Sequence, residues 1–344
     1  MYFEKLLKTA MSKKSNLLKF LKTYKPHVHA WLSQWQMKNI QNNAKNIQRG
    51  DILAFVCLKD EAARIPYFLE YYRNRGVGHF LFVDNDSSDG FFDQVKNQQD
   101  CSVWKTTTSY KNANFGLHWV NTLLRRYGTG HWCLTIDPDE FLVHPHGDAR
   151  SLKDLIEFLG SEQIKCLHTI MLDCYSDKPI AATNYAPGDD IFAAAPYFDP
   201  VGYVQTGKRK TGGVFVQGGP RMREMFADNP EQAPALNKTP LVFWKRHYAY
   251  VSSTHTINIK ALNNRTMAER GHPSAVLMHY KFLHLLSTKA SDPDVLKEHY
   301  MGGREYKKYD EKMGLSLYVP GISTRYKNAE QLCELGLMAR GYWL

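Results

Sequence analysis

A regular alternation of apolar runs and amphipathic stretches, between residues 51 and 136, constrains the fold of this chain more than any other feature. Each apolar run is long enough for one strand, and the segments between the runs place their apolar residues at helical spacing. Because such runs are buried on both faces, the pattern predicts an α/β fold with a mostly parallel sheet that helices flank. The predicted strands are residues 52–58, 79–83, 102–106 and 131–136, and the predicted helices are residues 61–75 and 116–127.

The pattern changes on both sides of this region. Residues 176–250 are rich in Gly, Pro and aromatic residues, and they predict an irregular half with long connections on the substrate side of the sheet. We therefore expect an N-terminal extension over residues 1–48, a main domain over residues 49–290 and a C-terminal helical extension over residues 291–344.

The charge of the chain is concentrated near its beginning. The net charge is +10, yet residues 1–50 hold nine Lys and one Arg against the single acid Glu4, so the rest is nearly neutral. A nucleic-acid-binding domain more often carries its basic face on the folded body, so no nucleic-acid partner is expected. Leu and Phe residues lie among these lysines at roughly helical spacing, which fits attraction to an anionic membrane surface. The alternative is a helix that packs permanently on the body.

The cysteines and the hydropathy predict where the protein resides. Six Cys are scattered without a C-x-x-C pair or a metal-type spacing, as is typical of reduced thiols in a cytosol. No run approaches the roughly 18 apolar residues of a membrane span, and the first residues lack the apolar core of a signal peptide. We expect a cytoplasmic protein that is peripheral at the inner membrane.

Acidic residues follow three of the predicted strands. Residues 59–61 (Lys-Asp-Glu) follow the first strand, a polar turn over residues 84–90 follows the second, and Asp137 and Asp139 follow the fourth. In a parallel sheet, ligands bind beyond the carboxyl ends of the strands. Carboxylates grouped at that edge repel one another unless a cation or a ligand compensates for their charge.

The Asp-x-Asp pair at residues 137 and 139 is the sharpest of these signals. In an extended segment, residues i and i+2 point to the same side, so both carboxylates could face one hard cation such as Mg²⁺ or Mn²⁺. Taken alone, this short motif is more often a helix cap or a pair of surface acids. Its place at the end of a buried strand favours the cation.

The turn that begins at Asp84 also allows two interpretations. It could be a turn and a helix cap, or Asp84 could accept hydrogen bonds from a nucleoside. The chain contains no G-x-G-x-x-G motif after its first strand and no G-x-x-x-x-G-K-[ST] motif. These absences argue against a dinucleotide-dependent enzyme and a P-loop kinase.

Seven segments follow one another along the chain and together form a specific pattern. They are residues 57–61, 83–90, 113–121, 137–140 (DPDE), 218–223 (GGPRMR), 238–241 (KTPL) and 279–282 (HYKF). In this order they resemble bacterial glycosyltransferases of family 2, in the subgroup with a long aromatic-rich C-terminal half. The resemblance covers about residues 52–285 and leaves residues 1–48 outside. Asp60 and Pro138 depart from the family pattern, which usually has Asn and a small residue at these positions.

The resemblance implies a GT-A fold, a UDP- or GDP-sugar donor, a glycan or lipid-linked acceptor, and inversion at the anomeric carbon with Mn²⁺ or Mg²⁺ as cofactor. It implies Asp139 as a direct metal ligand, Asp137 as a ligand of ribose or of the metal through water, and His279 as a third ligand. Surface polysaccharide or lipopolysaccharide is the expected product. The residues implied in donor binding are Lys59, Glu61, Asp84, Asn114, Asp137 and Arg221.

The general base has three candidates. Asp173 ends a further apolar run over residues 166–172, Glu224 follows the Gly-rich segment, and His255 is the third. Arg221 and Arg223 follow Gly218 and Gly219, which would allow close backbone approach to a ligand, and the two arginines could clamp a diphosphate or an acidic acceptor. Surface salt bridges are the alternative for both.

Two other functions are compatible with these residues. A protein of the same fold could bind nucleotide-sugars or glycans without catalysis. A metal-dependent phosphohydrolase or nucleotidyltransferase could use the same acids, although that chemistry usually needs a two-metal carboxylate cluster.

Overall fold

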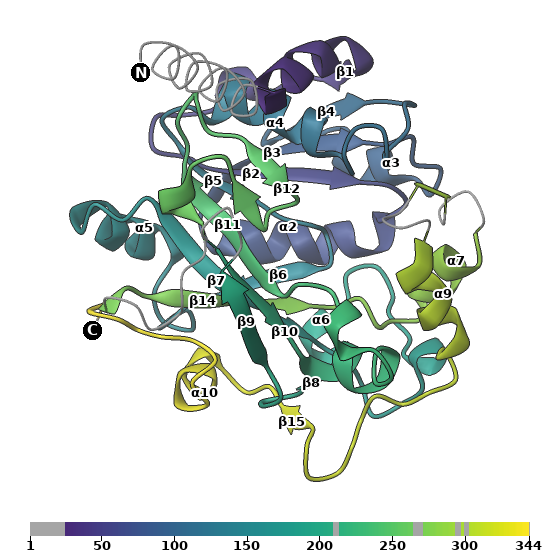
Figure 1. Cartoon of the computed structure of the whole chain (residues 1–344). Helices are drawn as coiled ribbons and strands as arrows, with labels where there is room; N and C mark the ends of the chain where they lie inside the picture. The colour runs from purple at the N-terminus through teal and green to yellow at the C-terminus, as the bar shows by residue number, and fades with distance from the viewer. Residues whose placement is uncertain (1–24, 209–212, 264–270, 293–296, 299–302, 344) are drawn as a thin grey trace, which may run out of the picture.

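A computed structural model of the chain describes residues 25–208, 213–263, 271–292, 297–298 and 303–343 (Figure 1). Most of the amphipathic pattern predicted near the N-terminus, over residues 1–24, lies outside the described residues. The described residues build one nine-stranded sheet with helices on both faces, together with three small two-stranded sheets.

The first half of the large sheet is parallel. Its order is β4-β3-β2-β5, and each neighbouring pair in this run is parallel. All four strands predicted between residues 51 and 136 are therefore confirmed, with ends that differ by two residues at most. They are β2 (Ile52–Leu58), β3 (Val77–Asp84), β4 (Cys101–Lys105) and β5 (Trp132–Thr135).

The second half of the sheet mixes strand directions. β11 lies antiparallel between β5 and β7, β14 is parallel to β7, and β6 closes this edge antiparallel to β14. A short strand, β1, lies antiparallel to β4 at the other edge. Six of the nine strands run in one direction, so the sheet is mostly parallel, as predicted. The additional strands are β1 (Lys38–Gln41), β6 (Glu140–Val143), β7 (Cys166–Asp173), β11 (Asn237–Phe243) and β14 (Ser274–His279).

Alternate residues of β2 enter two separate cores, which explains its continuous apolar sequence. Ala54 and Val56 pack in the core that contains α2 (Ile65–Asn74). Leu53 and Phe55 pack in the core that contains α4 (Leu117–Leu123) on the opposite face. A sheet covered on both faces needs apolar side chains in both directions.

The two predicted helices are confirmed with local irregularities. Residues 61–75 contain a 3₁₀ turn, η3 (Ala62–Arg64), followed by α2. Residues 116–127 contain α4 and a π-helical turn, η4 (Leu124–Gly128). Gly116 precedes α4 with φ +77°, and a Cβ there would lie 2.7 Å from the Cys57 sulfur, so this close contact requires glycine.

The irregular half predicted from residue 176 onward is confirmed. It contains short elements joined by long connections, and α7 and α9 lie beyond one end of the sheet (Figure 1). These elements are α6 (Ile191–Ala194), β8 (Tyr197–Phe198), β9 (Val204–Lys208), β10 (Val214–Gln217), η6 (Arg221–Met225), β12 (Tyr250–Ser252), β13 (Thr256–Ile257), α7 (Leu285–Ser291), α9 (Arg304–Glu311), β15 (Thr324–Arg325) and α10 (Ala329–Glu334).

The division into an extension, a main domain and a C-terminal extension stays a prediction. Residues 38–41 form a strand of the large sheet, and side chains of α10 lie in the same core as α2 and α5 (Leu152–Ser161). Within the described part of the chain, no helix is long and apolar enough to cross a membrane.

Candidate active site

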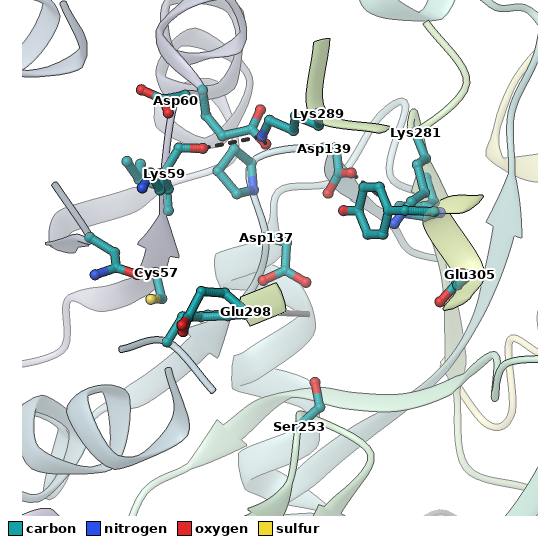
Figure 2. A pocket seen from close by; sticks show the side chains of 17 residues that line it. Cys57, Lys59, Asp60, Asp137, Asp139, Ser253, Lys281, Lys289, Glu298 and Glu305 are labelled. Atoms are coloured by element: carbon teal, nitrogen blue, oxygen red, sulfur yellow. Dashed lines mark hydrogen bonds and ion pairs between the residues drawn. The ribbon is translucent and has the colours of Figure 1, made fainter. Parts of the chain in front are cut away.

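A cavity of about 350 Å³ lies at the edge of the sheet where β2, β5 and β14 end. Its wall combines acids, lysines and aromatic rings from both halves of the chain (Figure 2). The lining residues are Cys57, Leu58, Lys59, Asp60, Glu61, Asn85, Tyr110, Asp137, Pro138, Asp139, Ser253, His279, Lys281, Lys289, Glu298, Glu305 and Tyr306.

The Asp-x-Asp pair lies in the middle of this wall. Asp137 and Asp139 occupy the connection between β5 and β6, with 55% of the Asp137 side chain exposed and 18% of the Asp139 side chain. Burial opposes ionisation of Asp139, but His279, Arg64 and Lys281 outweigh it and hold its pKa well below the ordinary value. Asp139 is therefore ionised at neutral pH.

His279, the last residue of β14, joins Asp139 to a buried acid. Its Nε2 lies 3.4 Å from Oδ2 of Asp139, and its Nδ1 lies 2.6 Å from Oδ1 of Asp173. The parallel pairing of β14 with β7 places His279 beside Asp173 in register. Burial would lower the pKa of His279, but the two carboxylates raise it above the ordinary value.

Asp173 is fully enclosed by its partners. Its side chain is 0% exposed, and Nε of Arg221 donates to its other oxygen over 2.7 Å. Nη1 of Arg221 in turn donates to Oε1 of Glu305 over 3.2 Å, and Glu305 lines the cavity. Arg221 and Asp173 thus form a buried layer that orients His279 and Glu305.

A second buried pair lies behind the Asp-x-Asp segment. The ammonium group of Lys238 contacts the Glu140 carboxylate, and it lies 3.3 Å from Oδ2 of Asp137. Burial raises the pKa of Glu140 to about 7, against the opposing effect of Lys238. Lys238 is the second residue of β11, whose antiparallel direction brings its beginning to this edge of the sheet.

The side chains at this edge can hold a divalent cation. Ligand atoms of Asp139, Glu140 and His279 lie within 4.8 Å of one another. The two carboxylates suit Mn²⁺ or Mg²⁺, which prefer oxygen ligands, and the Asp173 contact to Nδ1 of His279 leaves Nε2 directed at the cluster. Asp137, predicted as a ligand of ribose or of the metal through water, is not one of these three residues.

Lysines gather around the acids on the cavity wall. Nζ of Lys289 contacts the Glu61 carboxylate and donates to the backbone oxygen of Lys59 over 3.1 Å. Lys281 also lines the cavity, with its Nζ 4.8 Å from the centre of the Tyr306 ring. The predicted donor-binding residues Lys59 and Glu61 therefore line the cavity, as does Asp137.

Two other predicted donor residues, Asp84 and Asn114, are not among the lining residues of the cavity. Asp84 is buried at the end of β3 and accepts a hydrogen bond from the backbone N–H of Ser87 over 2.8 Å. Burial raises its pKa, although the contacts with Ser87 and Lys105 oppose this shift. Asn114 is not among the lining residues, whereas Tyr110 is. The donor roles of Asp84 and Asn114 stay predictions.

The remaining predicted residues lie outside the cavity lining. Glu224 pairs with Nη1 of Arg223 over 2.5 Å, and Nδ1 of His255 contacts the backbone oxygen of Asn237 over 2.5 Å. Gly218 approaches its own chain rather than an open space, because a Cβ there would lie 2.4 Å from the Gly202 oxygen.

Sequence reasoning assigned no role to several residues of this site. Lys238 and Lys281 belong to the KTPL and HYKF segments, so the segments pointed to them without showing what they contact. Lys289 and Glu305 lie beyond those segments, and no local pattern marks them. Their contribution depends on how α7 and α9 lie over the sheet edge.

No protein-family model matches this chain, and neither does any curated protein. Among solved structures, the chain is similar to the mannosyltransferase PcManGT from Pyrobaculum calidifontis in complex with GDP-Man and Mn²⁺, with 13% sequence identity and a TM-score of 0.27. The aligned part spans about half of each chain, 47% of this one and 46% of the other. A likeness of this size shows neither a family nor an activity.

Proposed function

We propose that this chain is a glycosyltransferase that moves a sugar from a UDP- or GDP-sugar donor to a glycan or lipid-linked acceptor. The proposal rests on two contacts of His279, one with the buried Asp173 and one with Asp139. Asp139 lines a cavity at the sheet edge, as does Asp137. We place its product in surface polysaccharide or lipopolysaccharide biosynthesis.

In this proposal the sugar is transferred with inversion. The acceptor oxygen attacks the anomeric carbon, its proton passes to a base, and the nucleoside diphosphate leaves with the bonding electrons. A divalent cation, when bound by Asp139, His279 and Glu140, offsets the negative charge on the diphosphate. In this proposal Asp137 would contact the ribose, or the cation through a water molecule.

Lysine side chains of the protein also supply positive charge near the proposed diphosphate position. Lys59, Lys281 and Lys289 line the cavity, and charge-assisted hydrogen bonds to phosphate are stronger than neutral ones. Asn85, which follows β3, lines the cavity, and in this proposal Asn85 and Asp84 would accept hydrogen bonds from the nucleoside. Arg221 acts on the site through Asp173 and Glu305 rather than through the donor.

We assign the general base to Glu305. Asp173, the first candidate from sequence, has both carboxylate oxygens engaged by His279 and Arg221 and no exposed side-chain surface. Glu305 lines the cavity, where Arg221 and the Tyr309 hydroxyl both contact its Oε1. A base must come within hydrogen-bond reach of the acceptor hydroxyl, which favours a cavity residue over a buried one.

The purified full chain tests this proposal. Incubation with a panel of UDP- and GDP-sugars and Mn²⁺ should release nucleoside diphosphate, and a strong chelator should stop the release. Asp139→Asn should lower the rate at least about a hundredfold, because several kcal/mol of charge stabilisation is lost. Asp93→Asn, in an exposed pair with Lys96, is the matched control and should leave the rate unchanged.

Other outcomes separate the alternatives. Binding of a nucleotide-sugar without any release, even with glycan acceptors present, would indicate a binding protein. Release of inorganic phosphate from a nucleotide, without cleavage of the sugar bond, would indicate a phosphohydrolase.

A further inference from the structure

The first described helix carries an exposed apolar stripe. Residues 25–33 are helical and continue into the 3₁₀ turn η1 (Gln34–Gln36). Val28, Trp31, Leu32 and Trp35 follow the i, i+3, i+4, i+7 spacing of one helical face, and their exposed fractions are 52%, 55%, 49% and 66%. The two indole rings lie edge to face, with centroids 4.6 Å apart. We call these four residues the tryptophan stripe.

The two tryptophans of this stripe are far more exposed than the other tryptophans of the chain. The sequence holds seven Trp, and the other five are at most 9% exposed. A contiguous exposed apolar surface of this kind usually marks an interaction site. The five buried residues are Trp104, Trp119, Trp132, Trp244 and Trp343.

The opposite face of the helix fixes the stripe in its outward orientation. Ala30 is 1% exposed, and its backbone oxygen accepts a hydrogen bond from the Thr122 hydroxyl over 2.6 Å. The His29 ring stacks on His118 of α4, with centroids 4.5 Å apart. The helix therefore packs on the body through its small and polar face. In Figure 1 it lies at the end of the molecule opposite α10 and β15.

The basic charge of the sequence around the helix indicates what the tryptophan stripe binds. Residues 1–50 carry nine Lys and one Arg against one acid, and Lys25, the first described residue of the helix, is exposed. Indole rings partition to the level of lipid headgroups, and lysines near an anionic leaflet add electrostatic attraction. We propose that the tryptophan stripe docks on an anionic lipid bilayer, with both indoles inserted at the headgroup level.

Two other possible partners of the tryptophan stripe are less compatible with the basic charge around it. A second copy of the chain would bring two strongly basic segments together, and their repulsion opposes such a dimer. A basic protein partner would meet the same repulsion. Docking on a bilayer does not depend on the proposed sugar transfer, so the two proposals can fail separately.

Fluorescence of the full chain tests the docking directly. The chain is mixed, without donor, with vesicles of phosphatidylcholine that contain about one third phosphatidylglycerol. Brominated acyl chains should quench part of the tryptophan emission, and Trp31→Ala with Trp35→Ala should abolish the quenching because the other five indoles are buried. In co-sedimentation, the double variant should bind the vesicles at least about tenfold more weakly.

Controls keep this result interpretable. Tyr342→Ala removes an aromatic ring that is 71% exposed in the C-terminal segment, and it should bind like the unmodified chain. Since both substituted indoles are exposed, the double variant should keep its thermal unfolding midpoint. Vesicle binding without quenching, binding that the double variant retains, or no binding at low salt would each overturn the proposal. A dimer that the double variant dissociates would assign the stripe to a second copy.

Discussion

At the scale of single residues, the site depends on buried charges that compensate one another. Asp173 contacts both His279 and Arg221, and an acid held in this way orients its partners instead of exchanging protons with a substrate. We therefore treat Asp173 as a positioning residue and Glu305 as the catalytic base. Substitution of each acid by its amide separates these roles.

Asp173→Asn should weaken Mn²⁺ binding by about 10- to 100-fold, because His279 loses the carboxylate that orients its ring. The activity that Asp173→Asn retains at saturating Mn²⁺ should still fall at acidic pH, so its pH profile of kcat/KM should keep the acidic limb. Glu305→Gln should leave Mn²⁺ binding nearly unchanged and lose that limb, since the proton acceptor is gone. Calorimetry with Mn²⁺ and kinetics across pH measure both quantities.

The reverse pattern of pH profiles would contradict this assignment of roles. If Asp173→Asn removed the acidic limb while Glu305→Gln retained it, Asp173 would be the base despite its burial.

Lys238 offers a test of charge compensation that does not depend on the substrate. Lys238→Met leaves the Glu140 carboxylate buried without its cation, so the free energy of unfolding should fall by about 3–5 kcal/mol. Lys238→Met combined with Glu140→Gln should recover most of this loss, because neither charge of this pair is then left buried without its partner. Urea unfolding of the metal-free chain gives the values.

Lys96→Met is the matched control. Its ion pair with Asp93 is exposed, so removing it should change the free energy of unfolding by less than about 1 kcal/mol. A double variant as unstable as Lys238→Met alone would show that the side-chain volume of Lys238, and not its charge, supports the fold.

At the scale of elements, the contact between residues 25–33 and α4 is sensitive to acid. Burial, with the nearby His29 and Lys25, lowers the pKa of His118 to about 4. Because this pKa is below the ordinary 6.5, His118 takes up a proton more readily when the helix is detached. The stabilisation is therefore complete above pH 6.5 and is lost as the pH falls toward 4.

Hydrogen exchange measures this effect. After correction for intrinsic rates, amides of residues 25–36 should exchange faster relative to the rest of the chain at pH 5 than at pH 7. His118→Phe keeps an aromatic ring against His29 but cannot be protonated, so most of the pH dependence should disappear. His272→Phe, at an exposed position, should behave like the unmodified chain. A pH dependence that His118→Phe leaves intact would point to another group.

At the scale of the whole molecule, the C-terminal segment completes the main core. Leu332, Leu337 and Trp343 pack in the core that also holds α2 and α5, and the Trp343 ring stacks on Phe158. The backbone oxygen of Ala339 accepts a hydrogen bond from Ser274 at the start of β14. The strand that carries His279 is thus supported by residues far along the chain.

Removal of residues 327–344 should therefore abolish cooperative unfolding. Each buried apolar side chain contributes about 1.5–3 kcal/mol, and several of them together approach the whole stability of a domain. The single change Trp343→Ala should lower the free energy of unfolding by about 3–5 kcal/mol, and Leu335→Ala, at a 39% exposed position, by much less. Circular dichroism during urea unfolding compares these three variants with the full chain, and a truncated chain that unfolds like the full one would show that the segment is dispensable.

The sequence by itself determined the strands and helices of the first half and the acids at their ends. Runs such as residues 52–58 carry apolar side chains in both directions, and this pattern alone indicates a strand covered on both faces. Asp137, Asp139 and Glu61 could be assigned to the site because the carboxyl ends of parallel strands meet at one edge. Each of these inferences uses neighbours that are local in the chain or fixed by strand direction.

The tertiary structure alone decided which charges compensate those acids. The alternation of side chains is the same in parallel and antiparallel strands, so the pattern could not show that β11 runs backwards and delivers Lys238 to Glu140. Nor could it show that Asp173 lies behind His279, or that α9 brings Glu305 to the cavity. These contacts join residues that are far apart in the chain, and their energy depends on burial and distance, which only the packed elements define.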